Sequence, residues 1–561
     1  MKKRIYSVVL VLALIAGVIV TANIIKSYNS AVVTEEETVT EYDKESVYLW
    51  YSDKSMENYL RAAAAEYNEK NNARVIVNYQ PQAEYLKEIN QSTIKNNVPD
   101  LFVVSHEKLG TAYQAGLAEP ILLSEAEFDN LYFGQAKNAV TYKDMLMGYP
   151  LCYETSVLLY NEYFLKQLSI LKLDEEFPER LDAILAQNTP EPSQSPTPTP
   201  TATPTPTATP TPDPKDDAAK VAQAMAKAKE NAEPTATPIP TATPTPEPTP
   251  ARFTDEEIYG KLTDLLPSTM DELTALGDSY DATMRNESVM KWDVSDVFYN
   301  YFFLGDSISV GGDAGWDTSH IEIYNLNAIK SLEAYQKLNA FFSMDTTDCT
   351  YEQIMQEFIE GKIVFTIATS DAVELIESAI EQGIFADGYG VTLIPAMSDT
   401  LGTRAMSETS CIAINPYSKH TETANDFARF VTTEYADKLY SLTCDRENGI
   451  SGKLSVASNV AYEYPAFGIF AEEYARSIPL PKMTETSNFW INLEAVFASV
   501  WNGEEPNKLL RNLAEQMMLQ ATGSVTTFDV IEVPVEESEE EEELDEAALS
   551  LEDTSSEEPP E

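Results

Sequence analysis

The sequence places one carboxylate where a buried strand is expected. Glu154 lies between Tyr153 and Thr155 within Leu151–Tyr160, an apolar stretch that predicts a strand. An ionised carboxylate in such a strand costs free energy unless it faces water or a partner that compensates its charge. We therefore expect Glu154 to face a wet cleft and to bind a polar ligand.

A polar corner follows the strand predicted at Leu101–Val104. That strand ends in Ser105-His106-Glu107, and a helix is predicted to begin immediately afterwards. Open α/β sheets bind ligands at the carboxyl ends of their strands, so the corner is a candidate ligand-binding edge. The alternatives are that Glu107 is a solvated acid favoured by the helix dipole and that His106 is a surface residue of the corner.

The residue types give little support to catalytic or metal chemistry. The chain has three histidines, which weighs against histidine metal sites and serine–histidine catalysis, and its four cysteines form no Cys-x-x-Cys pair. Carboxylates such as Asp53 and Glu154 could act as glycosidase acids, but nothing in the sequence positions them as such. We expect a binding protein without metal or cofactor, and not an enzyme.

The charge of the chain excludes one class of partner. The formal net charge of the 561 residues is -53, and the segment from Asp529 to Glu561 carries 16 acidic residues and no basic one. The rest of the chain stays strongly acidic when that segment is set aside. Such a surface repels phosphate backbones, so we expect no nucleic-acid partner.

The N-terminus has the pattern of a signal-anchor. Ile5–Ile25 is uncharged and long enough to span a bilayer, and Lys2-Lys3-Arg4 precedes it. We expect a single-pass anchor in the cell membrane over residues 1–26, with the remainder on the extracellular face. The alternative is a cleaved signal peptide and a secreted protein.

Strands and helices alternate in the first globular part. Val47–Trp50 and Arg74–Tyr79 predict strands, and apolar residues spaced three and four apart predict the helices between them, the first capped by Ser55. This alternation predicts an α/β fold with a parallel sheet. Later segments predict further strands at Ile363–Ala368, Tyr389–Pro395 and Cys411–Asn415, and further helices at Asn327–Phe342, Thr421–Thr433, Asn488–Val500 and Pro506–Leu519.

Two segments have compositions that do not form a packed core. Thr189–Pro250 contains 17 of the 32 prolines, mostly in Thr-Pro repeats, and proline lacks the backbone donor that regular structure needs. We interpret residues 188–252 as a disordered insert and residues 522–561 as an acidic disordered tail.

Seven segments, in order, resemble the extracellular solute-binding proteins of ABC transporters (family 1, maltose-binding-protein-like). The resemblance spans about residues 46–520, and the proline-rich insert interrupts it. The segments are Leu49–Lys54, Pro99–Pro120, Gly148–Asn161, Met355–Ile367, Tyr389–Pro395, Ile412–Asn415 and Ser487–Trp490.

The resemblance implies a two-lobed periplasmic-binding-protein-like fold of type II, with the ligand between the lobes. The chain is then a monomer that passes a small solute to ABC permease subunits in the membrane. The implied segments are the anchor 1–26, the stalk 27–45, lobe I at 46–152 and 411–458, lobe II at 153–410 and 459–521, the insert 188–252 within lobe II, and the tail 522–561.

The resemblance also implies a set of ligand-binding residues. Val104 and Asp371 stand where stacking tryptophans occur in the family, so the aromatic platform is thin and maltose itself is not expected. A carbohydrate or similar small solute remains the predicted ligand. The implied residues are Asp53, Lys54, Glu107, Glu154, Trp292, Asp293, Asp371, Trp490 and Glu494.

Other interpretations of these residues remain open. Asp53 could cap a helix, Trp490 could pack on a helix face, and Trp50 and Trp501 are expected in the core. A surface protein that senses or interacts without a role in transport is the alternative function. The sequence leaves the pairing of Cys152, Cys349, Cys411 and Cys444 open, and because the resemblance places two of them on hinge strands, a Cys152–Cys411 disulfide is a hypothesis.

Overall fold

The structure, a computed structural model, describes residues 45–81, 84–94, 98–180, 252–278, 286–342, 344, 349–439, 452–460 and 464–534. The predicted membrane anchor and most of the stalk, the insert and the tail lie outside these residues. No helix in the described part is both long and apolar enough to cross a membrane. The chain divides into a large unit, Met1–Gln167 with Leu265–Glu561, and a small unit, Leu168–Asp264.

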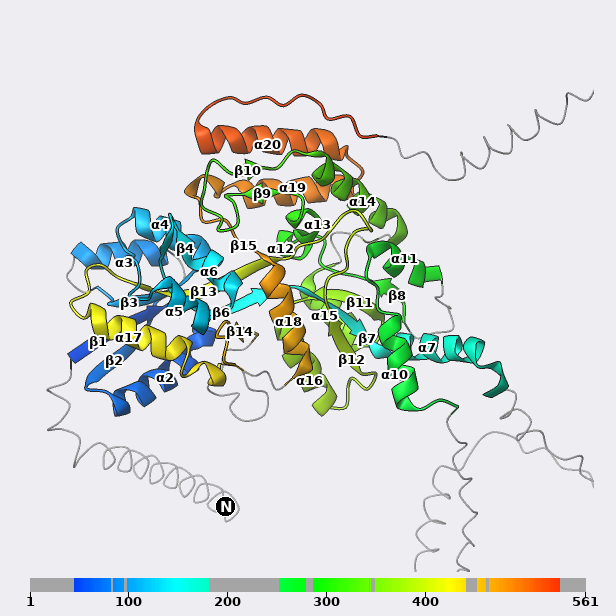
Figure 1. The fold of residues 1–561 in the computed structure, drawn as a ribbon, viewed down its shortest axis with the longest axis horizontal. Coiled ribbons are helices and arrows are strands. Elements are labelled where there is room, and N and C mark those ends of the chain that lie inside the picture. The colour runs from blue at the N-terminus through cyan, green and yellow to red at the C-terminus, as the bar shows by residue number, and fades with distance from the viewer. Residues whose placement is uncertain are drawn as a thin grey trace, which may run out of the picture. The chain divides into compact units, whose positions relative to one another are not determined.

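A seven-stranded mixed sheet lies in the large unit (Figure 1). Its strand order is β14-β6-β13-β3-β1-β2, and β15 pairs with β13. The predicted parallel pairing is confirmed where β1 pairs with β2 and β3, whereas β13 is antiparallel to β3 and β6. Its strands are β1 (Glu45–Tyr51), β2 (Ala73–Tyr79), β3 (Leu101–Ser105), β6 (Tyr149–Thr155), β13 (Met406–Ile414), β14 (Leu454–Ser455) and β15 (Ile478–Pro479).

A second sheet of four strands, in the order β12-β7-β11-β8, also belongs to the large unit. The prediction of a single strand at Leu151–Tyr160 is wrong in one respect. The strand breaks at Ser156, so that β6 joins the seven-stranded sheet and β7 joins the four-stranded one. The strands of the second sheet are β7 (Val157–Asn161), β8 (Ser288–Met290), β11 (Ile363–Ala368) and β12 (Tyr389–Thr392).

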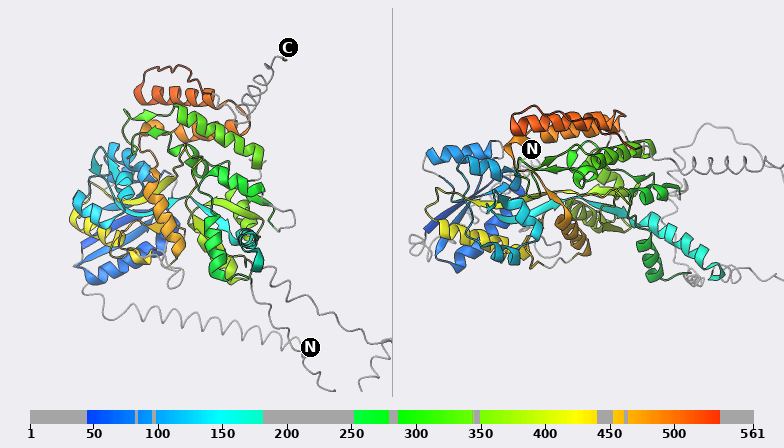
Figure 2. Two further views of the ribbon diagram at one scale, coloured as in Figure 1. Left: turned by 45° about the vertical axis from the view of Figure 1, so that its right-hand side comes forward. Right: turned by 45° about the horizontal axis from the view of Figure 1, so that its top comes forward.

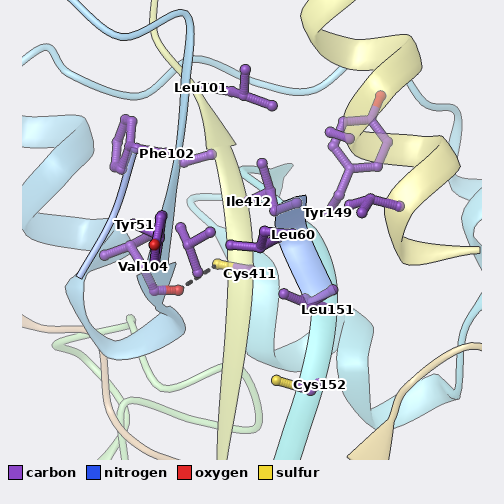
Figure 3. Close-up of a cluster of buried hydrophobic side chains, with 14 of the residues drawn as sticks. Tyr51, Leu60, Leu101, Phe102, Val104, Tyr149, Leu151, Cys152, Cys411 and Ile412 are labelled. Atoms are coloured by element: carbon purple, nitrogen blue, oxygen red, sulfur yellow. Dashed lines mark hydrogen bonds between the residues drawn. The ribbon is translucent and has the colours of Figure 1, made fainter. Parts of the chain in front are cut away.

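The apolar strands of the larger sheet build a buried core (Figure 3). Cys411 lies in it with its thiol directed at the carbonyl of Val104, 3.3 Å from sulfur to oxygen. Cys152 lies on the neighbouring strand, where it aligns with Ser410 rather than with Cys411. Both are buried free thiols, so the hypothesis of a disulfide between them is wrong.

Helices cover both faces of this sheet. In Figures 1 and 2, α2 and α17 lie on one face and α3 and α4 on the other. Tyr59 of α2 donates a hydrogen bond to the carbonyl of Val431 at 2.7 Å, which fixes α2 against α17. The helices around this sheet are α2 (Glu57–Lys70), α3 (Tyr85–Ile94), α4 (Leu109–Gln114), α5 (Glu125–Leu131), α6 (Gly134–Val140), α17 (Thr421–Thr432) and α18 (Pro465–Arg476).

A second aromatic core surrounds Trp292, which follows β8. The indole of Trp292 is fully buried and meets Trp501 edge-on, with ring centroids 5.5 Å apart. The helices of this part are α11 (Met270–Asp278), α12 (Val297–Asn300), α13 (Phe302–Gly305), α14 (Leu326–Phe342), α15 (Tyr351–Ile359), α16 (Asp371–Glu381), α19 (Phe489–Trp501) and α20 (Pro506–Thr522).

The first residues of the predicted disordered tail are packed. Gly523 ends α20 in the left-handed conformation, with φ 69°, and the chain then turns back. The backbone of Ile531 accepts a hydrogen bond from Asn507 and donates one to the hydroxyl of Tyr324. The prediction of disorder from residue 522 is therefore wrong for 523–534, and residues 535–561 lie outside the described part.

The small unit brings the two ends of the insert together. It contains most of α7 (Glu162–Glu176) and α10 (Asp255–Asp264). Arg180 pairs with Glu257, and Arg252 pairs with Asp174, each with a nitrogen–oxygen distance of 2.8 Å. The remaining short elements are η2 (Lys54–Met56), η3 (His106–Lys108), η4 (Ala436–Lys438), η5 (Thr484–Thr486), β4 (Thr141–Tyr142), β5 (Met145–Leu146), β9 (Ser309–Val310) and β10 (Ile321–Glu322).

Candidate functional site

Two carboxylates face each other across neighbouring strands of the larger sheet. Glu154 of β6 stands directly opposite Glu408 of β13. Like charges in directly opposed positions destabilise a sheet, so the pair needs a compensating charge. Lys453, beside β14 at the sheet edge, supplies it, with its ammonium 3.8 Å from a Glu154 oxygen and the side chain 20% exposed.

Asp53 joins this cluster from the turn after β1. One carboxylate oxygen accepts hydrogen bonds from the backbone and hydroxyl of Ser55, so Asp53 caps the helical turn η2. Its other oxygen lies 3.9 Å from the ammonium of Lys453. The capping alternative is therefore confirmed, and the expected cap Ser55 instead donates to the capping carboxylate. One carboxylate serves both the turn and the cluster.

Residues from around the four-stranded sheet form the other part of the cluster. The rings of Tyr299 and Tyr351 stack, with centroids 4.9 Å apart and planes 12° apart. The hydroxyl of Tyr351 donates to Asp371 at 2.8 Å, and the same carboxylate oxygen accepts from Thr369. Asp371 is the first residue of α16, where the helix dipole favours an acid.

The two parts of the cluster contact each other directly. The hydroxyl of Ser370 donates to the carbonyl of Gly452 at 2.8 Å. Burial raises the pKa of the Tyr299 hydroxyl, and the charges of Asp371 and Glu154 raise it further. Tyr299 therefore lies within electrostatic reach of carboxylates from both parts.

Electrostatics in the cluster favour the neutral form of Glu154. Burial raises the pKa of Glu154 to about 7, Lys453 opposes the rise, and Glu408, Asp371 and Asp53 add to it. Burial lowers the pKa of Lys453, but the Cys152 thiolate that forms at alkaline pH and the neighbouring carboxylates outweigh burial, and the pKa is raised. The cluster thus combines one stable cation with a carboxyl that titrates near neutrality.

The chemistry of this cluster is that of recognition. Half-exposed carboxylates accept hydrogen bonds from hydroxyl groups, and tyrosine rings offer flat apolar faces. In the described part of the chain, no group of three or more histidine, cysteine, aspartate or glutamate side chains could hold a metal ion. The arrangement suits a small solute that presents both hydroxyls and C–H faces.

The structure brings three of the nine predicted residues together: Asp53, Glu154 and Asp371. Lys54 lies in η2 and is exposed. Glu107 lies in the first turn of η3 and pairs with the exposed Lys108 at 2.8 Å. That pairing matches the solvated first-turn acid that the sequence left as an alternative.

Trp292 and Asp293 serve the framework in this structure. The indole N–H of Trp292 donates to Asn300 at 2.9 Å, and the ring is fully buried, which does not match an exposed stacking platform. Asp293 is 7% exposed and accepts hydrogen bonds from Ser295 and from the backbone of Tyr351. Asp293 thereby fixes the start of α15, which carries one of the two stacked tyrosines.

Trp490 and Glu494 lie in α19. The indole of Trp490 is half-buried and contacts Tyr301 and Phe489 edge-on, with centroids 5.8 and 5.0 Å away. Glu494 is exposed one turn further along the helix. These contacts agree with the packed-aromatic alternative for Trp490 while leaving part of its ring accessible.

His106 is not the surface residue that the sequence suggested. It is fully buried, and its Nδ1 accepts from the backbone N–H of Thr409 at 2.9 Å while Nε2 lies 3.1 Å from the carbonyl of Leu480. Burial, together with the nearby charge of Lys482, holds the pKa of His106 well below its usual value. The imidazole therefore joins β3, β13 and the end of β15 as a neutral structural residue.

Sequence reasoning missed Lys453, Glu408, Tyr299 and Tyr351. Glu408 carried a usable signal, because it lies just before the apolar strand predicted at Cys411–Asn415, and β13 itself already begins at Met406. Lys453 carried none, since it reaches Glu154 only through the pairing of Leu454 with Tyr153, about three hundred residues away in sequence. Long-range strand pairing is not visible in local periodicity.

A family profile described as "Bacterial extracellular solute-binding protein" matches residues 62–259. This match covers about a third of the chain, which is similar to the family over those residues. The description of this family as solute-binding agrees with the expectation of a binding protein rather than an enzyme.

Solved structures show the same fold at low sequence identity. The extracellular solute-binding protein from Staphylococcus aureus in complex with maltose is 17% identical, with a TM-score of 0.58 over 86% of this chain and 98% of that one. A cyclo/maltodextrin-binding protein complexed with maltotetraose is 15% identical, with a TM-score of 0.58 over 88% of this chain and 100% of that one. The two-lobed α/β fold expected from the sequence is confirmed by these likenesses.

A curated relative, the galactooligosaccharide-binding protein of Bacillus subtilis (strain 168), is 23% identical over 143 residues. The match covers 26% of this chain and spans about a third of that relative, 34% of its length. The chain is thus similar to solute-binding proteins in part of its sequence and to maltose-binding proteins in its fold.

Proposed function

We propose that this protein captures a small carbohydrate outside the cell and delivers it to an ABC importer. The observation that carries the proposal is the half-exposed cluster in which Asp53 and Glu154 meet Asp371 and the stacked pair Tyr299 and Tyr351. Sugars carry hydroxyls that suit carboxylates and apolar C–H faces that suit tyrosine rings. The maltose, maltotetraose and galactooligosaccharide named for the similar proteins support this class of ligand.

Binding by closure of two lobes is part of the proposal. Lobe I comprises residues 46–152 and 411–458, and lobe II comprises 153–410 and 459–521. The chain passes between the two sheets at Ser156 and again in the loop 393–405, so the crossings lie a few residues from these boundaries. Such crossings allow two sheets to turn relative to each other without breaking either one.

Isothermal titration calorimetry of the full chain in detergent tests the ligand class. The probes are maltose, maltotetraose, a galactose trisaccharide, a tripeptide and spermidine. We expect a saturable heat with at least one saccharide and a loss of affinity of at least tenfold in Glu154→Gln and Asp371→Asn. Glu69→Gln, an exposed acid on α2, is the control and leaves the affinity unchanged. Binding of the peptide or spermidine without binding of any saccharide would contradict the proposed ligand class.

Delivery to a permease and tethering by residues 1–26 are the remaining parts of the proposal. The uncharged run Ile5–Ile25 after three basic residues supports the tether, although it lies outside the described residues. Permease genes next to the gene for this chain would support transport. A saccharide-binding protein whose gene has no such neighbours, and whose deletion leaves uptake of that saccharide unchanged, would instead fit the sensing alternative.

A further inference from the structure

Lys453 occupies the centre of the carboxylate cluster and comes from a different part of the chain than any carboxylate. It precedes β14, whose Leu454 pairs with Tyr153 of β6, and this pairing places the lysine beside Glu154. Its ammonium lies 3.8 Å from Glu154 and 3.9 Å from Asp53. This cation therefore offsets part of the negative charge of two carboxylates that the proposed function uses for hydrogen bonding.

The residue before Lys453 is held by the other part of the site. Gly452 has φ 68°, and a Cβ added to it would lie 2.7 Å from the Cβ of Asp371, so no other residue fits there without a shift. Its carbonyl accepts the hydrogen bond from Ser370 at the start of α16. Because Gly452 is fixed on both counts, the backbone from which Lys453 extends has a defined position.

The two ion-pair distances decide what the carboxylates can still do. At 3.8 and 3.9 Å the ammonium attracts both groups but is too far away for a hydrogen bond to either oxygen. The Asp53 and Glu154 side chains retain 41% and 29% exposure. Hydroxyl groups of a neutral solute can therefore donate to these oxygens, whereas Lys453 offsets part of the negative charge that would otherwise attract a cationic solute.

We propose that Lys453 is a specificity-determining residue of the proposed ligand site, which lets Asp53 and Glu154 bind the hydroxyls of an uncharged solute and disfavours solutes with a cationic amino group. This inference rests on the proposed function and narrows its ligand to neutral polyhydroxy compounds. Discrimination by a fixed like charge is a common route to specificity.

Calorimetry with two matched probes tests the inference. Maltotriose is neutral, whereas the trimer of glucosamine has a similar size and carries ammonium groups at pH 6. We expect the wild type to favour the neutral trimer and Lys453→Met to shift the ratio of the two affinities by about tenfold or more toward the cationic trimer. Lys453→Arg keeps the wild-type ratio because it keeps the charge. Lys438→Met, which removes a lysine on η4 that pairs with Glu66, is the matched control.

The outcomes separate this inference from the proposed function. Saccharide binding with an unchanged ratio in Lys453→Met overturns the role of Lys453 and leaves the proposed function intact. A wild type that prefers the glucosamine trimer also overturns the role of Lys453 and leaves the proposed function intact. A wild type that binds neither trimer nor any other saccharide contradicts the proposed function itself.

A measurement without ligand checks that Lys453→Met folds and acts through charge. Carboxyl-carbon NMR of the full chain should show the Glu154 pKa rising in Lys453→Met, because the cation that opposes the effect of burial is gone. The Lys438→Met spectrum should leave this pKa in place. An unchanged Glu154 titration in a folded Lys453→Met protein would overturn the inference even where no ligand is known.

Discussion

Glu154 links the stability of the ligand-free protein to its binding chemistry. Its pKa is raised to about 7, first by burial and then by Glu408, Asp371 and Asp53, while Lys453 opposes the rise. The folded protein therefore holds a proton on Glu154 between about pH 4.5 and pH 7, where the unfolded chain does not. The folded state therefore loses stability relative to the unfolded state as the pH rises through that window. In the proposed function, a site that binds hydroxyls through this carboxylate is maintained against that cost.

Glu154→Gln should remove this dependence on pH. Relative to the variant, the wild type is expected to lose on the order of 1–3 kcal/mol of unfolding free energy between pH 5 and pH 8, because glutamine keeps the side-chain volume without the titrating proton. Urea denaturation of both proteins at the two pH values measures the difference. Glu69→Gln should show the wild-type dependence. Parallel pH curves for wild type and Glu154→Gln would contradict the raised pKa.

At the scale of single residues, the sequence indicates which side chains are unusual better than it indicates which residues they contact. Glu154 was singled out because a carboxylate in an apolar strand is unusual, and Asp53 because of the family resemblance. The capping by Asp53 was also predictable from residue type. Trp292 was not distinguishable from a ligand platform, since full burial among Trp501, Phe342 and Phe303 depends on helices from distant parts of the chain.

Helix α18 shows how one element stabilises the region between the sheets. Tyr474 stacks on Tyr153 of β6, with centroids 4.1 Å apart, and its hydroxyl bonds to Thr409 of β13 at 2.8 Å. Glu473, fully buried, pairs with Arg476 at 2.9 Å. These two side chains also hold the backbone of Ile394, beyond β12, through both its N–H and its carbonyl. One helix therefore fixes strands of both sheets.

Removal of the arginine in this pair should be costly. Arg476→Met leaves Glu473 buried without its counter-charge, and we expect a loss of about 3 kcal/mol in unfolding free energy. The double variant Glu473→Leu with Arg476→Met should recover most of it, since the uncompensated carboxylate is gone. Urea denaturation at pH 7 measures all three proteins. An Arg476→Met protein as stable as the wild type would show that the pair does not hold the two strands.

At the scale of elements, strands that are apolar and bounded by turns were predictable, and their sheet membership was not. The bounds of Ile363–Ala368 were predicted correctly because every position in it is apolar or threonine. All six residues are buried in the structure. The break at Ser156 was missed because apolar residues lie on both sides of it within Leu151–Tyr160, and nothing local indicates that two sheets share this stretch. The packed segment 523–534 was missed because its anchors, Tyr324 and Asn507, are supplied from elsewhere.

For the whole molecule, the two ion pairs of the small unit make a prediction about the insert. Arg180 and Arg252 flank residues 181–251 and are tied to Glu257 and Asp174, so the ends of this segment are close together. Replacement of 181–251 by a short Gly-Ser linker should leave the melting temperature within about 3 °C of the wild type, with unchanged ligand affinity. Differential scanning calorimetry measures the first quantity. A large drop in melting temperature would assign a stabilising role to the replaced segment.

The control for this replacement also removes one of the two ion pairs that hold the ends of the segment together. Arg252→Ala in the shortened protein takes away one of the two ion pairs and is expected to cost less than about 1 kcal/mol, since both partners are partly exposed. Ligand affinity should stay unchanged because the carboxylate cluster lies entirely in the large unit. A fall in affinity in either protein would contradict the independence of the two regions.

The break at Ser156 limits the kinds of motion that the two sheets can make. A single residue connects β6 to β7, so the Cα atoms of Thr155 and Val157 lie at most about 7 Å apart and the sheets cannot slide far past each other at this point. The other crossing, residues 393–405, is a longer loop with slack. In the proposed closure, the motion at this connection is therefore a pivot about the backbone torsions next to Ser156, with displacement that grows with distance from this residue. Glu154, two residues from the pivot, would move least, and groups on the outer edges of the sheets would travel furthest.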